Sequence, residues 1–218
     1  MYKLPKKHLI VLRIVTYVTV FLALICSLVA GFFVIYIRVP VNGLSMYPTL
    51  NSSYQQTKNR DYVYINRFAD VNNGDIVVLD LRKYDAFGDY AIKRLVAVEG
   101  DIVNITYDSN NMQYNLIVNN KIIDYRPYQI DGYNTFSCFE QYVHRNIDDE
   151  TRVVKNESGE VKGINIKQGE IFVLGDNWET SNDSSRVGPL KYKDIVGRVD
   201  MIIKPNENEL ISVFKRIF

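Results

Sequence analysis

The sequence predicts a mainly β domain that follows a single N-terminal transmembrane helix. Two observations predict this fold class. Residues 14–37 form a run of 24 residues without a charge. The chain beyond them carries short runs rich in β-branched and aromatic residues, each bounded by Gly, Asn or Asp. A chain of 218 residues has room for one such domain and an appendage, so several independent domains are not expected.

The uncharged run is long enough to cross a membrane. As a helix rising about 1.5 Å per residue, residues 14–37 would extend about 36 Å, more than the ~30 Å hydrocarbon core of a bilayer. The apolar region of a cleaved signal peptide has only about 7–15 residues and ends in small ones. This run ends in aromatic residues and Arg38, so we interpret it as a retained anchor.

Charge is distributed unevenly along the chain. Residues 1–38 carry five basic side chains and no acidic one, whereas residues 39–218 carry 21 basic and 25 acidic ones. Because Lys and Arg favour the cytoplasmic side of a membrane, we predict a cytoplasmic N-terminus (1–13) and an extracytoplasmic domain (38–218) on a single-pass cell-membrane protein. The lipid bilayer is then a partner, and the acidic balance of the domain disfavours nucleic acid.

Six strands are expected in the domain, at residues 62–65, 75–81, 90–98, 101–107, 170–174 and 195–203. A hairpin is expected where residues 116–118 and 121–123 flank Asn119 and Asn120, since adjacent asparagines tolerate the positive φ angles of a tight turn. Residues from about 104 to 166 are the most polar and irregular, and we predict that they form an inserted subdomain. No long amphipathic helix is evident.

Cysteine and histidine offer little chemistry here. Cys26 lies inside the span and Cys138 far outside it, so a disulfide between them is not expected, and no spacing indicates a metal site. His8 lies on the cytoplasmic side of the anchor, and His144 lies in the polar segment without a catalytic context. The chain is therefore poorly equipped for a Ser-His-Asp triad.

Three clusters could carry chemistry, and the first contains Ser45. It reads Gly-Leu-Ser-Met-Tyr-Pro-Thr-Leu at residues 43–50, a few residues beyond the span. Ser45 could be an ordinary loop hydroxyl, because a serine becomes a nucleophile only when a neighbouring base takes its proton. With histidine poorly placed, lysine is the alternative base.

The second cluster, residues 90–101, offers Lys93. On a strand, alternation places Ala91, Lys93, Leu95 and Ala97 on one face. A lysine among small apolar neighbours loses water, which lowers its pKa and lets the neutral amine accept a proton. The ordinary alternative is a lysine on an edge strand whose amine reaches solvent. The third cluster, residues 175–189, is dense in short polar side chains and by itself indicates a turn-rich loop.

Together and in this order, the clusters resemble the type I signal peptidase family. The motifs are Ser-Met-x-Pro-Thr-Leu at 45–50, Gly-Asp-Ile-Val-Val at 74–78, Ile-Lys-Arg-x-Val-x-x-x-Gly-Asp at 92–101 and Gly-Asp-Asn-x-x-x-Ser-x-Asp-Ser at 175–184. The resemblance extends from the anchor to about residue 203. One anchor, a short exported domain and Gly43 look more like Gram-positive members than the larger two-anchor Gram-negative ones.

The resemblance implies a membrane-bound serine endopeptidase with a signal-peptidase-type β domain. It would remove signal peptides from exported precursor proteins, in functional coupling with the translocation machinery, by means of a Ser/Lys dyad and without a cofactor or metal. Ser45 would be the nucleophile. Lys93 would be the general base, which takes the Ser45 proton, protonates the leaving amine and activates the hydrolytic water.

The resemblance also implies supporting roles. Ser181 would orient the Lys93 amine, Asp183 and Asp176 would hold their loop through buried polar contacts, and Arg94 would pair with Asp183. The Ser45 backbone N–H would donate to the oxyanion.

Gly43, Met46 and Ala91 would complete the oxyanion and substrate-binding site by the same resemblance. Some relatives have a serine at the position of Gly43, so the sequence does not identify a second oxyanion donor. Ala91 and Ala97 would suit the close approach of an extended substrate strand.

Three residues depart from the family pattern. Trp178 stands where an arginine is usual, Ser185 stands where an arginine is expected after Asp-Ser, and Ala97 replaces a common glycine. The motifs of Ser45 and Lys93 are intact, so we expect activity. The departures put in doubt an ion pair at Asp183 and the usual substrate preference.

Two other interpretations compete with this one. The Ser/Lys self-cleaving repressor proteases share the dyad, but they are cytosolic and carry a DNA-binding module, and the anchor argues against them. A catalytically inactive membrane-tethered β-rich adaptor could bind signal sequences or envelope proteins. The presence of both Ser45 and Lys93 argues against an adaptor, whose binding would not depend on them.

Overall fold

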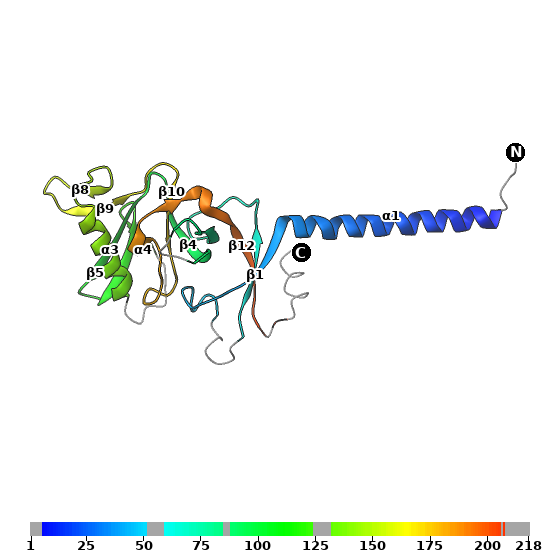
Figure 1. The fold of residues 1–218 in the computed structure, drawn as a ribbon, viewed down its shortest axis with the longest axis horizontal. Coiled ribbons are helices and arrows are strands. Elements are labelled where there is room, and N and C mark those ends of the chain that lie inside the picture. The colour runs from blue at the N-terminus through cyan, green and yellow to red at the C-terminus, as the bar shows by residue number, and fades with distance from the viewer. Residues whose placement is uncertain (1–5, 52–58, 85–87, 124–131, 206, 208–218) are drawn as a thin grey trace. The chain divides into compact units, whose positions relative to one another are not determined.

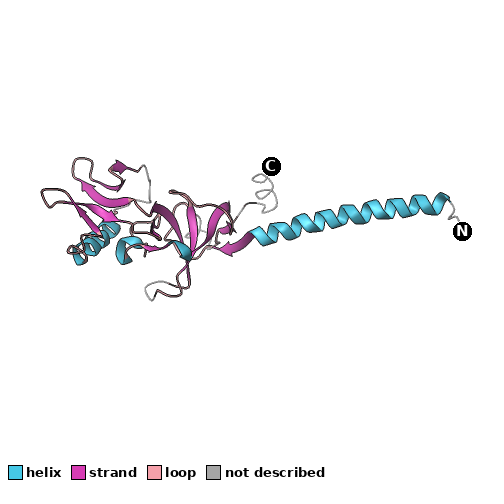
Figure 2. Cartoon of the chain, turned by 90° about the horizontal axis from the view of Figure 1, so that it is seen from above, coloured by secondary structure: helices cyan, strands magenta, loops and turns pink. Residues whose placement is uncertain are grey.

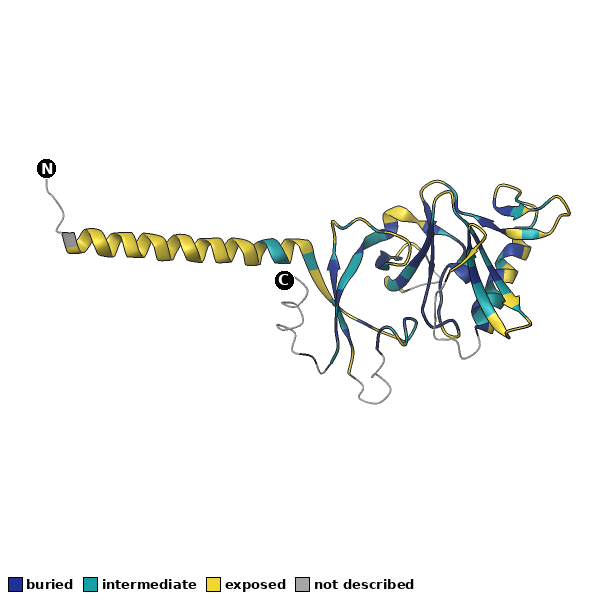
Figure 3. Ribbon diagram, turned by 180° about the vertical axis from the view of Figure 1, so that it is seen from behind, coloured by how far each residue is buried: buried dark blue, intermediate teal, exposed yellow. Residues whose placement is uncertain are grey.

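The computed structural model describes the chain except residues 1–5, 52–58, 85–87, 124–131, 206 and 208–218 (Figure 1). Two units are distinguished, residues 1–37 and residues 38–218. The first is dominated by helix α1 (Lys6–Ile35), of which Lys7–Ile35 is long and apolar enough to cross a membrane, with a mean hydropathy of 2.8. Its side chains are almost all exposed (Figure 3). The predicted apolar helix is thus confirmed, although it begins eight residues earlier than the uncharged run.

Strands dominate the second unit (Figure 2). A seven-stranded sheet has the order β1-β2-β12-β3-β4-β10-β11, and its pairs from β2 to β11 are antiparallel. Its strands are β1 (Tyr36–Pro40), β2 (Tyr62–Asn66), β3 (Ile76–Asp80), β4 (Tyr90–Val98), β10 (Glu170–Leu174), β11 (Leu190–Lys191) and β12 (Ile195–Ile203). The predicted strands at 90–98, 170–174 and 195–203 are confirmed residue for residue, and the other three to within a residue or two.

A second sheet of five strands has the order β7-β6-β5-β9-β8. Its strands are β5 (Ile102–Asp108), β6 (Gln113–Val118), β7 (Lys121–Ile122), β8 (Val153–Lys155) and β9 (Val161–Asn165). The predicted hairpin is confirmed between β6 and β7, where Asn119 and Asn120 have φ angles of 52° and 63°. The segment expected to be irregular is therefore largely regular, because its polar residues alternate with buried ones along short strands.

Helix α3 (Tyr133–Arg145) is an amphipathic helix of 13 residues that was not predicted from the sequence, where no long amphipathic helix is evident. Its buried residues Thr135, Phe139 and Val143 recur every fourth position, which places them on one face. Phe136 and Tyr142 pack against the same apolar cluster, whereas Ser137, Glu140 and Gln141 are polar. Two short helical turns follow β10: α4 (Ser184–Val187) and a 3-10 turn (Tyr192–Asp194).

The second sheet lies in sequence between β4 and β10, which pair with each other. One apolar cluster nevertheless joins the two sheets: it contains Ala97 of β4, Phe172 of β10, Ile105 of β5, Leu116 of β6 and Phe139 of α3. Because this core is continuous, residues 38–218 form one compact unit. A separate inserted subdomain stays a prediction, while the predicted fold class, mainly β behind an N-terminal apolar helix, is confirmed.

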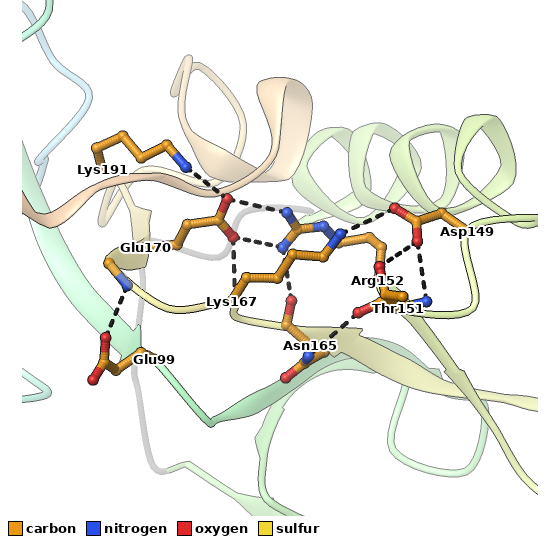
Figure 4. A network of polar contacts seen from close by, with 9 residues as sticks. Glu99, Asp149, Thr151, Arg152, Asn165, Lys167, Glu170 and Lys191 are labelled. Atoms are coloured by element: carbon orange, nitrogen blue, oxygen red, sulfur yellow. Dashed lines mark hydrogen bonds and ion pairs between the residues drawn. The ribbon is translucent and has the colours of Figure 1, made fainter.

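A polar network supports the segments that lead into β10 (Figure 4). The Arg152 guanidinium donates to both carboxylate oxygens of Glu170 at 2.8 and 3.2 Å and to the Asn165 carbonyl at 2.7 Å. Lys191 of β11 also donates to Glu170, at 3.1 Å. Arg152 and Glu170 are both buried, so this network fixes the start of β10 within the core.

Candidate active site

The loop that carries Ser45 is anchored at its base by a reciprocal pair. The Asn51 amide N–H donates to the Asp61 carboxylate at 2.7 Å, and the Asp61 N–H donates to the Asn51 side-chain oxygen at 2.8 Å. The Asn51 side chain also donates to the carbonyls of Val41 and Gly43 at 3.0 and 2.9 Å. Both ends of the loop are thereby fixed to one buried residue.

Within this loop Ser45 is half-buried and Gly43 is exposed. Gly43 has a φ of 80°, which favours glycine, and a Cβ there would meet no atom within 4 Å. Met46 is 2% exposed in an apolar cluster with Leu50, Val63 and Val78. Its side chain packs the loop on the core and is not available to a substrate. Only a contribution of the Met46 backbone to substrate binding stays a proposal.

Lys93 lies on β4 between Ala91 and Leu95 and directly opposite Val77 of β3. It is only 4% exposed. Burial lowers the pKa of its amine, and the carboxylates of Asp183 and Asp176 partly oppose that shift. The expected apolar surroundings are thus present, and the edge-strand alternative is wrong, because β4 lies between β3 and β10.

A register shift on β4 corrects the predicted common face of Ala91, Lys93, Leu95 and Ala97. Ala97 pairs with Phe172 but Leu95 pairs with Val173, so one extra residue of β4 is accommodated between them. Beyond that point the alternation is interrupted: Leu95 and Ala91 pack in one apolar cluster, and Ala97 packs in another at 0% exposure. Ala97 is therefore not available to a substrate strand, whereas Ala91 remains half-buried.

Residues 175–183 form a loop, here called the 175–183 loop. Asp183 joins the two ends of this loop. One Asp183 oxygen accepts the Gly175 N–H at 2.9 Å. The other accepts the N–H and the hydroxyl of Ser185 at 3.0 and 2.8 Å, which caps α4. Asp183 is fully buried. Ser185 stands where the family pattern has an arginine, and its hydroxyl donates a hydrogen bond to Asp183.

The structure corrects the predicted partner of Arg94. Its guanidinium makes a two-pronged ion pair with Asp176, at 2.9 and 2.6 Å, and not with Asp183. The third guanidinium nitrogen donates to the Gly74 carbonyl at 2.7 Å, and the Thr49 hydroxyl donates to Asp176. Asp183 is occupied by the backbone of its own loop, which leaves Asp176 as the acceptor. This ion pair joins all the predicted clusters.

The Ser45 loop and the 175–183 loop are in direct contact. The Asn177 N–H donates to the Ser45 carbonyl at 3.0 Å, and its side chain donates to the Leu44 carbonyl at 3.2 Å. Gly175 lies against the same point, since a Cβ there would clash with the Ser45 carbonyl oxygen and with Ser181 Oγ. Ser181 is 6% exposed, and its hydroxyl is buried without a hydrogen-bond partner among the described residues.

Lys93 is brought to the same place by strand pairing. Its neighbour Arg94 pairs with Leu174, the last residue of β10, and Gly175 begins the 175–183 loop. In the described part of the chain, neither the Ser45 hydroxyl nor the Lys93 amine makes a hydrogen bond. Both groups are therefore uncommitted, which suits a pair whose catalytic hydrogen bonds tighten only when substrate is bound.

The site offers acid-base and nucleophilic chemistry. No group of three or more His, Cys, Asp or Glu residues that could hold a metal ion occurs among the residues described. What the arrangement contains is a hydroxyl, an amine of lowered pKa and backbone N–H groups. This is the composition of a site for acyl transfer.

Sequence reasoning missed three residues that shape the site. Asn177 ties the two loops together, Thr49 binds Asp176, and Thr135 of α3 donates to the carbonyl of Trp178. Asn177 and Thr49 lie within the quoted motifs, so their presence there was the available signal. Thr135 belongs to no motif and had none.

Comparison with known proteins adds independent evidence. The family model described as "Signal peptidase, peptidase S26" matches residues 12–204. A signal peptidase I from Bacillus caldolyticus is 34% identical over 169 residues, covering 73% of this chain and 75% of that protein. Signal peptidase I P from Bacillus subtilis subsp. natto is 29% identical over 170 residues, covering 76% and 75%. A solved signal peptidase I from Enterococcus faecalis matches 60% of this chain and 97% of its own, with 22% identity and a TM-score of 0.36.

Proposed function

The chain belongs to the peptidase S26 family of signal peptidases, and we propose that Ser45 and Lys93 form the dyad with which it cleaves signal peptides. One observation carries the assignment of residues. A lysine that is 4% exposed, with a pKa lowered by burial, lies on the strand beside the loop that contacts the Ser45 backbone. Ser45 itself is half-buried.

The proposed reaction has two stages. In the first, neutral Lys93 takes the proton of the Ser45 hydroxyl while Ser45 Oγ attacks the scissile carbonyl carbon. The negative charge that develops on the carbonyl oxygen is stabilised by the Ser45 backbone N–H, with Gly43 shaping the turn beside it. The protonated Lys93 then donates its proton to the leaving amine, the C–N bond breaks, and the signal peptide stays attached to Ser45 as an ester.

In the second stage Lys93 takes a proton from water, and the resulting hydroxide attacks the ester carbon. The C–O bond to Ser45 breaks, and Lys93 returns a proton to Ser45 Oγ, so the enzyme regains its starting state. In this proposal Ser181 orients the Lys93 amine between these transfers. Asp176 joins the two loops through Thr49 and is held by Arg94, and Asp183 keeps the 175–183 loop closed.

The substrates we propose are precursor proteins that carry signal peptides, because signal peptidases are this chain's relatives. We place α1 across the cell membrane as a single span, with its basic N-terminus in the cytoplasm and the catalytic domain outside. Coupling to the translocation machinery follows from that placement, since precursors emerge there. The inactive adaptor is not favoured, because its binding would need neither Ser45 nor a buried lysine.

Cleavage by the full-length protein in liposomes tests the dyad. The substrate is a precursor with Ala at the first and third positions before the cut. We expect Ser45→Ala and Lys93→Met each to lower kcat/KM at least about 10²-fold. The exposed residues Ser109 and Lys121 provide matched controls, Ser109→Ala and Lys121→Met, that keep full activity. Full cleavage by either dyad variant would refute the assignment.

The wild-type pH profile provides a second test of the same proposal. Lys93 must be neutral to act as a base, so cleavage is expected to fall as the pH falls through its pKa. That limb lies below the ordinary lysine range because burial lowers the pKa. A profile without an acidic limb would exclude Lys93 as the base.

A further inference from the structure

Helix α3 forms hydrogen bonds to the backbone of the 175–183 loop. Thr135 donates to the Trp178 carbonyl twice, from its N–H at 3.2 Å and from its hydroxyl at 2.7 Å. The side chain of Asn134 donates to the next carbonyl, that of Glu179. The first turn of α3 thus holds two consecutive peptide groups in the middle of the loop.

The side chain of Trp178 makes the same connection through the core. It is 1% exposed and belongs to the apolar cluster that contains Phe139 and Val143 of α3 and Leu116 of the second sheet. Trp178 stands at the position where the family pattern has an arginine. A side chain that would carry charge toward solvent is thus replaced by an apolar anchor that draws the middle of the loop into the core.

The second half of α3 holds the chain that follows the loop. The Arg145 guanidinium donates to the Arg186 carbonyl at 3.0 Å. Gly188 lies so close to the Tyr142 ring that a Cβ there would clash with it. Helix α3 therefore contacts the middle of the 175–183 loop and also the residues that follow the end of this loop.

Other contacts of this loop lie around the proposed dyad. Gly175 lies against both the Ser45 carbonyl and Ser181 Oγ, since a Cβ there would clash with each, and Asn177 donates to the Ser45 carbonyl. Asp176 and Asp183 are the charged groups that act on Lys93. Beside Lys93, the neighbouring strands β3 and β10 present apolar residues, Val77 directly opposite and Leu174 next to Arg94.

We propose that Thr135 and Trp178 are positioning residues, which hold the 175–183 loop against Lys93 so that Ser181 and the Ser45 loop stay in register and water stays out. This inference rests on the proposed dyad. The burial of Lys93 depends on where this loop lies. If the contacts of Thr135 and Trp178, here called the tether, are weakened, water reaches the Lys93 amine. Its pKa then rises toward the ordinary lysine value, and less of the neutral base is present at neutral pH.

The test compares pH profiles of kcat/KM for the full-length enzyme in liposomes. Thr135→Val removes one hydroxyl at constant volume, and Trp178→Phe shortens the anchor. For both we expect the acidic limb to move to higher pH, with activity regained in alkali. A displacement of one pH unit would lower cleavage at neutral pH about tenfold. Thr135→Ser keeps the hydroxyl and is expected to restore the wild-type limb.

Two controls separate positioning from general destabilisation. Thr151→Val removes an exposed hydroxyl that binds Asp149 and does not contact the 175–183 loop. Leu81→Ala creates a cavity in a different apolar cluster, which does not contain Trp178. Both are expected to leave the limb in place, even where Leu81→Ala lowers the unfolding midpoint. Because Trp178 is the sole tryptophan, its emission shows directly whether Thr135→Val exposes the anchor to water, and we expect a red shift.

The outcomes are distinguishable. A limb that stays in place in both tether variants, with activity lowered equally at every pH, would overturn the positioning role and leave the dyad intact. Should Trp178→Phe fail to fold, Thr135→Val decides alone. Cleavage that survives Ser45→Ala or Lys93→Met would instead overturn the dyad, whatever the tether variants do.

Discussion

Lys93 and Arg152 are the cationic side chains that lie buried in the described part of the domain, at 4% and 8% exposure, and their surroundings differ. Arg152 makes three hydrogen bonds, two of them to the Glu170 carboxylate (Figure 4). Burial alone would lower the pKa of Arg152, but Glu170 holds it above the ordinary value. Lys93 makes no hydrogen bond among the described residues, and burial lowers its pKa.

The difference separates a structural cation from a reactive one. A buried charge is tolerated when hydrogen bonds and an opposite charge replace the water it has lost. Arg152 meets that condition and stays charged, so it joins the segments around β10. Lys93 does not meet it, and an amine that is poorly stabilised as an ammonium ion is ready to act as a base. The comparison predicts opposite effects of removing the two charges.

The largest effect is expected for Arg152→Met. The variant leaves the Glu170 carboxylate buried, with only Lys191 and backbone groups to stabilise it, which typically costs about 3–5 kcal/mol. We expect the free energy of unfolding, measured in denaturant on the detergent-solubilised protein, to fall by that amount. Activity per folded molecule should persist, because the hydrogen bonds of Arg152 go to Asn165 and Glu170 and not to the 175–183 loop. The exposed Lys162 provides a control, Lys162→Met, which should change neither quantity.

Loss of activity in Arg152→Met, at a temperature where the variant is fully folded, would contradict the comparison. It would mean that the Glu170 network also sets the geometry of the dyad.

A smaller effect of opposite sign is expected for Lys93→Met. The folded-state pKa of Lys93 lies below the unfolded value, so the folded state binds this proton less readily than the unfolded state. Ammonium formation therefore costs stability at neutral pH, and a methionine of similar length removes that cost. We expect unfolding stability to rise by about 1 kcal/mol, the size common among stabilising substitutions at functional sites, while cleavage is lost.

The sign of this change is the test. Reduced stability in Lys93→Met, with Lys121→Met unchanged, would mean that Lys93 contributes to the fold as Arg152 does.

The strands could be predicted from the sequence because their signal is local. The runs at 90–98 and 195–203 combine β-branched residues with bounding Gly, Asp or Pro, and the structure begins and ends both strands there. Helix α3 was not predicted because one of its three buried residues, Thr135, is polar, and because Phe136 and Tyr142 pack on the core while polar side chains stand among them. A face of such mixed composition is recognisable only when the surface it covers is known.

The site was predictable in its motifs and not in its pairings. Ser45 and Lys93 stand in distinctive surroundings, but the sequence cannot decide which of Asp176 and Asp183 binds Arg94. That depends on the backbone N–H of Gly175, which occupies Asp183. Nor could the sequence reveal that a register shift beside Phe172 moves Ala97 into another cluster. Both results arise from contacts between segments distant in the chain.

The smallest effect on unfolding stability is expected for Lys191, an exposed residue of the Arg152 network. Lys191 also donates to Glu170 at 3.1 Å, but its side chain is 49% exposed, and exposed ion pairs contribute only about 0.2–1 kcal/mol. Lys191→Ala should therefore lower unfolding stability by less than 1 kcal/mol, and added salt should reduce even that difference by screening the pair. A loss as large as that of Arg152→Met would mean that Glu170 depends on total positive charge, whereas a small one assigns its stabilisation to the buried two-pronged bond with Arg152.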